Sequence, residues 1–209
     1  ADRLLVPSVA TEPELVEIWP SDRVGVCRTG VAEIFGQMPQ PLLLPTAMEQ
    51  KSQLLQRTSR RYLLLYVGRL SPEKNVDALL DALSLLPDCA LWIVGDGPSR
   101  AALEEQAREL PVQFTGYQHG ETLVALYRTA DCFVCPSQTE TFGQTVNEAL
   151  AAGTPVVLPD VAVFKEAYGR FSPVAFWKAG DQFSMVKRIQ SQLRCNSAAS
   201  DASADGSCS

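Results

Sequence analysis

Two cations stand close together in the stretch "VGRLSPEKN", where Arg69 directly follows Gly68 and Lys74 comes shortly after. Arginine offers a planar fork of hydrogen-bond donors, and lysine offers a mobile point charge. Both suit the oxygen atoms of a phosphate or diphosphate ligand. The alternative is that both are solvated surface cations, and these residues by themselves do not decide between the two interpretations.

Two glutamates, Glu140 and Glu148, lie on either side of "TFGQTVN". The pattern predicts that a helix begins near Phe142 and Gly143, where free backbone amides and the helix dipole form an anion site. Side chains on a helix slope toward its N-terminus, so Glu148 would lean back toward a ligand docked there and accept from a pair of ribose hydroxyls. Glu140, in the loop, could accept from a second set of hydroxyls. The alternative is an exposed loop acid and a charge on the helix surface.

Glycines and one histidine offer further candidates. The stretch "VGDGPS" contains Gly95 and Gly97, but Arg100 stands where the dinucleotide fingerprint requires Gly or Ala. The pattern therefore argues against a nicotinamide site and favours a tight turn that lets a ligand approach the backbone, as we also expect at Gly143. His119, the single histidine, is interpreted as a loop residue rather than a catalytic base.

Strands and helices that alternate from residue 62 onward would position these residues. Uninterrupted apolar runs are typical of strands buried on both faces, and they occupy residues 62–68, 90–96, 112–116, 131–137 and 154–160. Between them, apolar residues three and four apart predict amphipathic helices, as in "VDALLDALSLL", "RAALEEQAREL" and "ETLVALYRTA". This alternation predicts an α/β fold with a doubly wound parallel sheet, whose ligands bind at the carboxyl ends of the strands.

Four segments of different character divide the chain. Residues 1–40, with "RLLVPS", a helical "EPELVEIW" and a strand-like "RVGVCRTGV", are interpreted as the end of a preceding domain. Residues 41–60 are weakly patterned and are interpreted as a connector. Residues 61–194 form the predicted sheet domain, which ends with one more strand in "SPVAFWKAGD" and one more helix in "QFSMVKRIQSQL". Residues 195–209 are rich in Ser, Ala and Asp and are predicted to be a disordered tail.

The composition narrows the class of protein. Hydrophobic residues make up 46% of the chain and charged residues 20%, as in globular proteins. A net charge of −6 without a basic tract argues against a nucleic-acid partner. Cys132 and Cys135 would point to opposite faces of a strand, and no second pair completes a zinc site. We therefore expect the six cysteines to be reduced thiols in a reducing compartment.

The motifs, taken together and in this order, resemble the nucleotide-binding C-terminal domain of the retaining, GT-B-fold glycosyltransferases of family 4. They are "YVGRLSPEKN", "VGDGP", "FTGYQHGETLVALYRTADCFVCPS" and "ETFGQTVNEALAAGTPVV". The resemblance covers residues 62–160, and more loosely 1–190. It implies a Rossmann-like domain with a remnant of the N-terminal domain. The wording is most similar to plant and algal sulfoquinovosyltransferases, and bacterial mannosyltransferases share nearly the same motifs.

The resemblance implies that several residues bind a nucleotide-sugar donor. Arg69 and Lys74 match the pair that holds the donor diphosphate and offsets charge on the leaving group. Glu148 matches the acid that binds the ribose hydroxyls, and Glu140 matches the acid that contacts the donor sugar. Arg69, Lys74 and Glu140 would thus be the catalytic residues. A backbone cradle and a loop near the base would supply the other donor contacts, from Phe142, Gly143, Gln144, Thr145, Tyr117 and Gln118.

The implied reaction is the retaining transfer of a sugar from a UDP-linked donor to an acceptor such as a membrane lipid, as in sulfoquinovosyldiacylglycerol synthesis. The alternatives are a GDP-mannose-dependent mannosyltransferase and a non-catalytic subunit that binds nucleotide sugars. No Asp-x-Asp occurs in the chain, which agrees with a site that uses no metal and no cofactor. The expected location is intracellular, in the cytoplasm or a plastid, including the membrane surface.

Two departures from the family pattern affect these expectations. The family usually has a Gly-Gly turn and an acid after the fifth strand, where this chain reads "DVAVFKEAYG". Lys165 and Glu166 are the candidates to replace them. The acceptor-binding domain is expected to be missing, so this chain would supply the donor half of the site and need an N-terminal acceptor domain.

Overall fold

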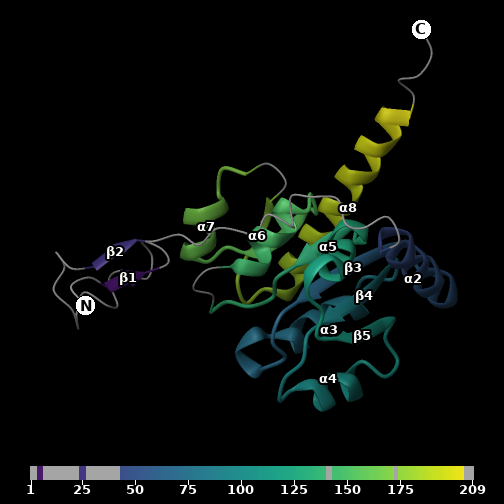
Figure 1. The fold of residues 1–209 in the computed structure, drawn as a ribbon, viewed down its shortest axis with the longest axis horizontal. Coiled ribbons are helices and arrows are strands. Elements are labelled where there is room, and N and C mark those ends of the chain that lie inside the picture. The colour runs from purple at the N-terminus through teal and green to yellow at the C-terminus, as the bar shows by residue number, and fades with distance from the viewer. Residues whose placement is uncertain (1–3, 7–23, 27–42, 140–142, 172–173, 205–209) are drawn as a thin grey trace, which may run out of the picture.

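A six-stranded, entirely parallel sheet forms the centre of the protein (Figure 1). It is seen in a computed structural model that describes residues 4–6, 24–26, 43–139, 143–171 and 174–204. The strand order is β5-β4-β3-β6-β7-β8. The strands are β3 (Tyr62–Val67), β4 (Cys89–Val94), β5 (Val112–Gly116), β6 (Cys132–Val134), β7 (Val156–Pro159) and β8 (Val174–Trp177). The predicted doubly wound sheet is therefore confirmed.

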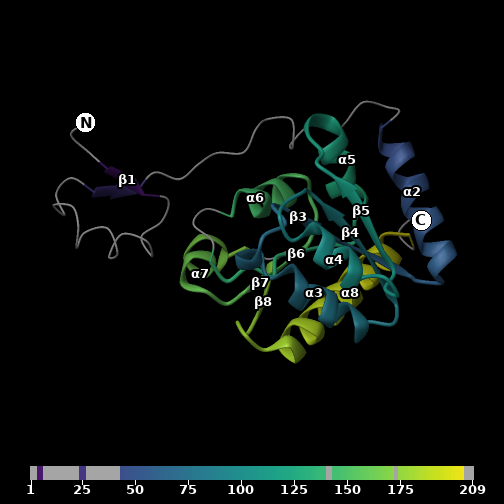
Figure 2. The ribbon, with the colours of Figure 1, turned by 90° about the horizontal axis from the view of Figure 1, so that it is seen from below.

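Helices cover both faces of the sheet, and Figure 2 shows α5 and α6 on one side of it and α3 and α8 on the other. They are α2 (Leu43–Thr58), η4 (Pro72–Lys74), α3 (Val76–Ser84), α4 (Arg100–Gln106), α5 (Gly120–Thr129), α6 (Gln144–Ala151), α7 (Ala162–Tyr168) and α8 (Gln182–Ala204). Side chains in β3 alternate between the two cores: Leu63 and Leu65 pack with α5 and α6, and Leu64 packs with α3 and α8. Burial on both faces explains why the strands are apolar throughout.

The chain order of the strands creates a crevice beside β3. The chain runs from β3 outward to β4 and β5, and then returns to the other side of β3 to build β6, β7 and β8. Strands β3 and β6 are direct neighbours, with Leu64 opposite Cys132. The segments that follow them lead to α3 and α6, on opposite faces of the sheet, so the two loops separate at their carboxyl ends. Such a switch point is where doubly wound folds bind ligands.

Residues 43–58 form a regular helix, α2, within the weakly patterned segment that we interpret as a connector, and the role of this segment as a connector stays a prediction. The helix is stabilised by tertiary contacts. Leu54 is buried in the core, and Lys51 donates to Asp131 Oδ1 at 2.6 Å and to the Thr129 carbonyl at 3.0 Å. Asp131 also accepts from the Leu63 amide at 2.7 Å, which ties α2 to the start of β3. Local sequence gives little sign of these hydrogen bonds, because each joins residues between 68 and 80 positions apart.

The two ends of the chain differ in how far the expectations hold. Two short strands, β1 (Leu4–Val6) and β2 (Val24–Val26), pair in parallel where "RLLVPS" and the strand-like "RVGVCRTGV" stand. The helix expected in "EPELVEIW" lies outside the described residues, and the assignment of this segment to another domain stays a prediction. At the other end, α8 continues to Ala204. The predicted disordered tail is therefore wrong as far as residue 204, and residues 205–209 lie outside the described part.

Candidate nucleotide-sugar site

A cavity of about 430 Å³ opens at the carboxyl ends of β3 and β4 and beside the start of α6. Five of the predicted site residues line it, namely Arg69, Tyr117, Gln118, Thr145 and Glu148. They come from the loop after β3, the loop after β5 and helix α6. The crevice that the strand order creates is thus hollow and carries the residue types that the sequence singled out.

A second, smaller cavity of about 220 Å³ adjoins the first, because Val67, Gly68, Arg69 and Thr145 line both. Lys74 and Gln144 line this second cavity. Arg69 is exposed and lies between the two spaces. The two cations therefore face the first turn of α6, whose leading amides have no acceptor within the helix. Cations and helix amides that converge in this way suit a diphosphate.

The structure brings together seven of the ten predicted site residues in these two cavities. An eighth, Gly143, caps α6 directly before Gln144. Glu140 and Phe142 lie outside the described residues, so their predicted roles remain predictions. The predicted site residues that the structure describes therefore gather at one edge of the sheet.

An anionic neighbour of the two cations, Glu73, was not predicted. Ser71 Oγ donates to the Glu73 carboxylate at 2.5 Å, and this hydrogen bond, with the nearby charges of Arg69 and Lys74, lowers the pKa of Glu73. The Glu73 carbonyl accepts from Ser137 and Thr139, at 3.4 and 3.3 Å, in the loop after β6. Helix η4 is therefore fastened to the loop that leads to α6, which keeps the cations beside that helix.

Glu148 lies in the second turn of α6, half-buried, and its carboxylate faces the larger cavity. Tyr127, from α5, donates its hydroxyl to Glu148 Oε2 at 3.0 Å. Burial raises the pKa of Glu148, and hydrogen bonds from Tyr127 and Gln144 oppose that rise. Sequence reasoning missed Tyr127 because it occupies an apolar helix face 21 residues away and reads as a core residue.

Gly143 begins α6 with φ = 61°, in the left-handed region, and its carbonyl accepts from the Val146 amide at 2.9 Å. A Cβ atom there would lie 2.8 Å from Phe164 and 3.1 Å from the Tyr168 hydroxyl. The glycine is thus needed for the backbone conformation and for close packing on α7. This account differs from our expectation that Gly143 leaves room for a ligand.

Gly95, in "VGDGPS", also serves the packing of one loop on another. Its φ is 133°, and a Cβ atom there would lie 2.0 Å from the Gly68 carbonyl oxygen. The Gly95 amide donates to the Gly116 carbonyl at 2.8 Å, and the Leu70 amide donates to the Asp96 carbonyl at 2.9 Å. The structure therefore corrects our interpretation of this turn: the close approach that requires glycine is by the β3 loop, which carries Arg69.

The loop after β5 closes the far end of the larger cavity. Tyr117 is 77% exposed and stacks on His119, with 6.1 Å between ring centroids. Gln118 is held by a hydrogen bond to the Thr115 carbonyl at 3.0 Å. His119 is exposed and precedes α5, which agrees with its interpretation as a loop residue. An exposed aromatic ring and an amide at the cavity mouth could contact a nucleobase.

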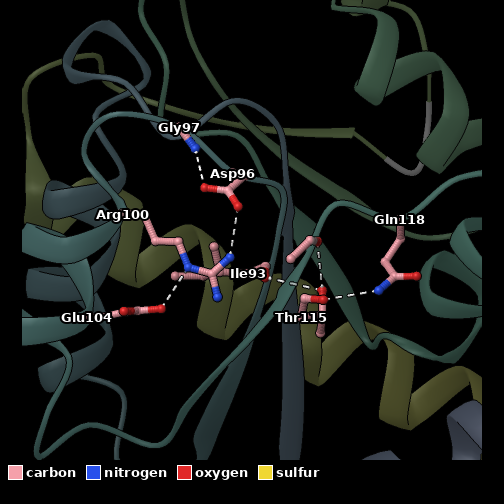
Figure 3. Close-up of polar contacts among 8 residues, drawn as sticks. Ile93, Asp96, Gly97, Arg100, Glu104, Thr115 and Gln118 are labelled. Carbon is pink, nitrogen blue, oxygen red and sulfur yellow. Dashed lines mark hydrogen bonds and ion pairs between the residues drawn. The ribbon is translucent and has the colours of Figure 1, made fainter.

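An ion-pair network holds the loop after β4, which also lines the larger cavity. Figure 3 shows Arg100 between Asp96 and Glu104, at distances of 3.1 and 2.8 Å. Asp96 also accepts from the Gly97 amide at 2.7 Å, so its carboxylate is held at the start of the loop. Asp96 lines the larger cavity, although no role was predicted for this residue.

Lys165 is placed away from these cavities. It pairs with Asp160 at 3.3 Å. The hydrogen bond from the Ala179 amide, and then the one from Lys165, lower the pKa of Asp160. Neither Lys165 nor Glu166 is among the described residues that line the two cavities. The suggestion that this pair replaces the family's sugar-side contact therefore gains no support.

The predicted placement of Cys132 and Cys135 on opposite faces of a strand is confirmed. Cys132 and Cys135 pack in the two different cores, on opposite faces of the sheet, and both are unbridged, as is Cys89. Burial raises the pKa of Cys89 to about 12, which keeps this thiol protonated and inert. Within the described ranges, no group of three or more His, Cys, Asp or Glu residues is arranged to bind a metal ion.

Among the helices in the described part of the chain, none is both long and apolar enough to cross a bilayer.

The strand order and the helices on both faces define a Rossmann-like, doubly wound domain. Residues 48–206 match the family model described as "Glycosyl transferases group 1", so the chain belongs to this family of glycosyltransferases.

Two curated relatives illustrate the range within this family. The chain is 31% identical over 170 residues to sulfoquinovosyl transferase SQD2 of Arabidopsis thaliana, covering 77% of this chain and 32% of that protein. It is 38% identical over 161 residues to a GDP-mannose-dependent alpha-mannosyltransferase of Mycolicibacterium smegmatis, covering 77% of this chain and 40% of that protein. The chain thus spans well under half the length of these relatives.

Solved structures agree on the fold. Anabaena HepE, crystallised in complex with UDP-glucose, superposes with a TM-score of 0.80 at 20% identity, over 94% of this chain and 55% of HepE. WaaG, a glycosyltransferase of lipopolysaccharide biosynthesis, superposes with a TM-score of 0.75 at 21% identity, over 92% of this chain and 54% of WaaG. The predicted GT-B-type, Rossmann-like domain is therefore confirmed as a fold.

Proposed function

We propose that this chain binds the nucleotide-sugar donor of a glycosyltransferase and provides the donor half of its active site. The observation that carries the proposal is that Arg69, Lys74 and the start of α6 gather around the smaller cavity, while Glu148 lines the larger cavity that adjoins it. A cationic end and a carboxylate end fit the diphosphate and the ribose of one ligand.

The proposed chemistry is donor activation by charge. As the bond between the sugar and the diphosphate breaks, negative charge develops on the leaving group. Arg69, Lys74 and the first amides of α6 would stabilise that charge, which is a major source of catalysis in such sites. The role requires no metal, because the two cations supply the positive charge. Glu140 would contact the donor sugar, and transfer would proceed with retention of configuration.

The relatives and the solved structures suggest two classes of donor, because their names give different nucleotides. A UDP-linked sugar agrees with the UDP-glucose complex of HepE, and GDP-mannose agrees with the mannosyltransferase of Mycolicibacterium smegmatis. We propose a UDP-linked donor and a membrane-lipid acceptor, with a sulfoquinovosyl lipid as the specific product and an acceptor-binding domain as the required partner. The alternatives are GDP-mannose-dependent transfer and a non-catalytic binding subunit.

Calorimetric titration of the chain with UDP and with GDP tests the proposed site. We expect one of the two to bind, and the nucleotide that binds more tightly identifies the donor class. Arg69→Ala should weaken that binding by roughly tenfold or more, because a charged hydrogen-bond donor to the phosphates is lost. Arg108→Ala is the matched control, because this exposed arginine pairs with Glu105 on α4 and does not line either cavity.

The absence of heat with both nucleotides, from a chain shown to be folded by circular dichroism, would overturn the donor-site proposal. Incubation with radiolabelled UDP-glucose or GDP-mannose and lipid vesicles then addresses catalysis. Because the proposal requires an acceptor-binding domain, this assay is made with that domain present. Label transferred to lipid then supports a transferase, and nucleotide binding without transfer favours the binding-subunit alternative.

Lys74→Ala should separate the phosphate contacts from the base contacts. We expect the affinity for the nucleoside diphosphate to fall by roughly tenfold, with little change for the bare nucleoside, because only the phosphates meet the lysine. Titrations with UDP and uridine, or with GDP and guanosine, measure the two effects. If both affinities fall equally, Lys74 acts through the folding of the loop, and its assigned role is wrong.

A further inference from the structure

The ring of Tyr127 and its hydroxyl have different surroundings. The ring is fully buried in the core beneath α6, with the Phe133 ring 5.8 Å away between centroids. The backbone of the same residue is fixed separately, because its carbonyl accepts from Thr154 Oγ at 2.7 Å. A phenylalanine would satisfy both of these contacts. The hydroxyl is therefore what needs an explanation.

The hydroxyl points at α6, where it lies 3.0 Å from Glu148 Oε2 and 3.2 Å from the Thr145 carbonyl. Both Thr145 and Glu148 line the larger cavity. A buried tyrosine hydroxyl normally requires a partner, and here the partner is a carboxylate that faces a ligand space. Each carboxylate oxygen can accept more than one hydrogen bond, so the contact from Tyr127 leaves Glu148 able to accept from a ligand.

We propose that Tyr127 is a positioning residue for Glu148: its hydroxyl holds the ionised carboxylate at the cavity wall, where the carboxylate can accept the neighbouring hydroxyls of a ribose. This inference rests on the nucleotide-sugar site proposed above. Without the hydroxyl, the half-buried carboxylate would lose a donor and would be protonated more readily, and a protonated carboxyl group is a poorer acceptor for two hydroxyls.

Several other groups lie near Glu148, and Tyr127 is the phenol that donates to it from the core side. Gln144, one turn earlier on α6, also donates to the carboxylate. Arg69, Asp96 and Tyr117 line the same cavity from the loops after β3, β4 and β5. Cys135, at the end of β6, lies near the Tyr127 hydroxyl, and burial raises the pKa of Tyr127 further above its usual range. The phenol therefore stays protonated and acts as a donor.

Tyr127→Phe tests the inference in the unliganded chain. Titration of the Glu148 carboxyl carbon by NMR should show a higher pKa in the variant than in the wild type, since the hydrogen bond from Tyr127 favours the ionised form. Tyr168→Phe is the matched control. It removes another tyrosine hydroxyl that binds near the start of α6, but this hydroxyl donates to Asn147 Oδ1 at 2.7 Å and lies 3.3 Å from the Gly143 carbonyl. The pKa of Glu148 should be unchanged in that control.

Titration with uridine and guanosine across pH provides the second readout. In Tyr127→Phe, affinity for the bound nucleoside should fall roughly three- to tenfold at neutral pH, and the loss at acidic pH should begin at a higher pH. In a Glu148→Gln background, Tyr127→Phe should cause no further loss. An unchanged Glu148 titration, or a Tyr127→Phe chain that does not fold, would overturn the inference. If the wild type binds neither nucleoside, the proposed function fails, and the NMR titration still decides whether Tyr127 controls Glu148.

Discussion

Glu148→Gln is expected to weaken nucleoside binding by roughly 10- to 100-fold, because hydrogen bonds to a charged acceptor are the stronger kind and both ribose hydroxyls need an acceptor. Glutamine keeps the shape of the side chain and an oxygen that can accept from Tyr127. It offers one acceptor oxygen in place of two, and it carries no charge. The measurement is calorimetric titration with uridine and guanosine, whose lack of phosphate excludes effects at Arg69 and Lys74.

The same substitution should leave the free energy of unfolding unchanged or raise it. Burial raises the pKa of Glu148, so the folded chain binds a proton there more tightly than the unfolded chain. The stability that this group contributes is therefore complete below its ordinary pKa and declines as pH rises through the higher folded value. Glutamine does not titrate, so urea unfolding should show the wild type losing stability relative to Glu148→Gln across that pH window.

Glu49→Gln on α2 is the control, because this exposed glutamate accepts a hydrogen bond from Gln53 within the same helix and lines neither cavity. It should not change nucleoside binding. If Glu148→Gln binds nucleosides as well as the wild type does, the ribose role is wrong. If it loses binding together with several kcal/mol of stability, Glu148 is a structural residue.

Gly95→Ala should be the most destabilising single substitution that we consider. The new Cβ atom would lie 2.0 Å from the Gly68 carbonyl oxygen, and the backbone has φ = 133°. Backbone strain and overpacking together should cost about 2–6 kcal/mol of unfolding free energy. Relief of the clash requires the β3 loop to move, and Arg69 directly follows Gly68, so nucleotide affinity should fall as well. Urea unfolding and titration with UDP and GDP measure the two effects.

Gly180→Ala separates the clash from the strain. Gly180 has φ = 80°, but an added Cβ atom there would meet no heavy atom within 4 Å. We expect a loss of about 1–2 kcal/mol from the left-handed backbone alone, and no change in nucleotide affinity. Equal losses in the two variants would show that the contact between Gly95 and Gly68 is unimportant and that the β3 loop is positioned by other contacts.

The sheet and the place of the site could be predicted from local pattern. The runs of β3 and β4 do not alternate between apolar and polar residues. They can therefore be buried only in strands that are covered on both faces. Arg69 follows β3, and Gln144 and Thr145 follow β6, and the carboxyl ends of parallel strands meet at one edge. The convergence of these residues is therefore a consequence of topology, and topology follows from the alternation of strands and helices.

Other features depended on contacts that no local pattern reveals. Residues 43–58 have the polar composition of a connector, but they form a helix. This helix is stabilised by the burial of Ala47 and Leu54 and by the ion pair of Lys51 with Asp131. The short helix α7 was not predicted, although its Phe164 and Tyr168 lie closest to the Cβ position of Gly143. Low-complexity composition suggested a disordered tail, whereas α8 continues through it to Ala204.

The sequence by itself determined the parallel α/β architecture and the chemical character of the site, because strand periodicity and residue type are local properties. Only the tertiary structure decided how the site is held. It assigned Gly95 and Gly143 to packing between loops and helices, placed Glu73 beside the two cations, and put the Tyr127 hydroxyl against Glu148. These contacts join segments far apart in the chain, and their geometry exists only when the sheet and both helical layers are assembled.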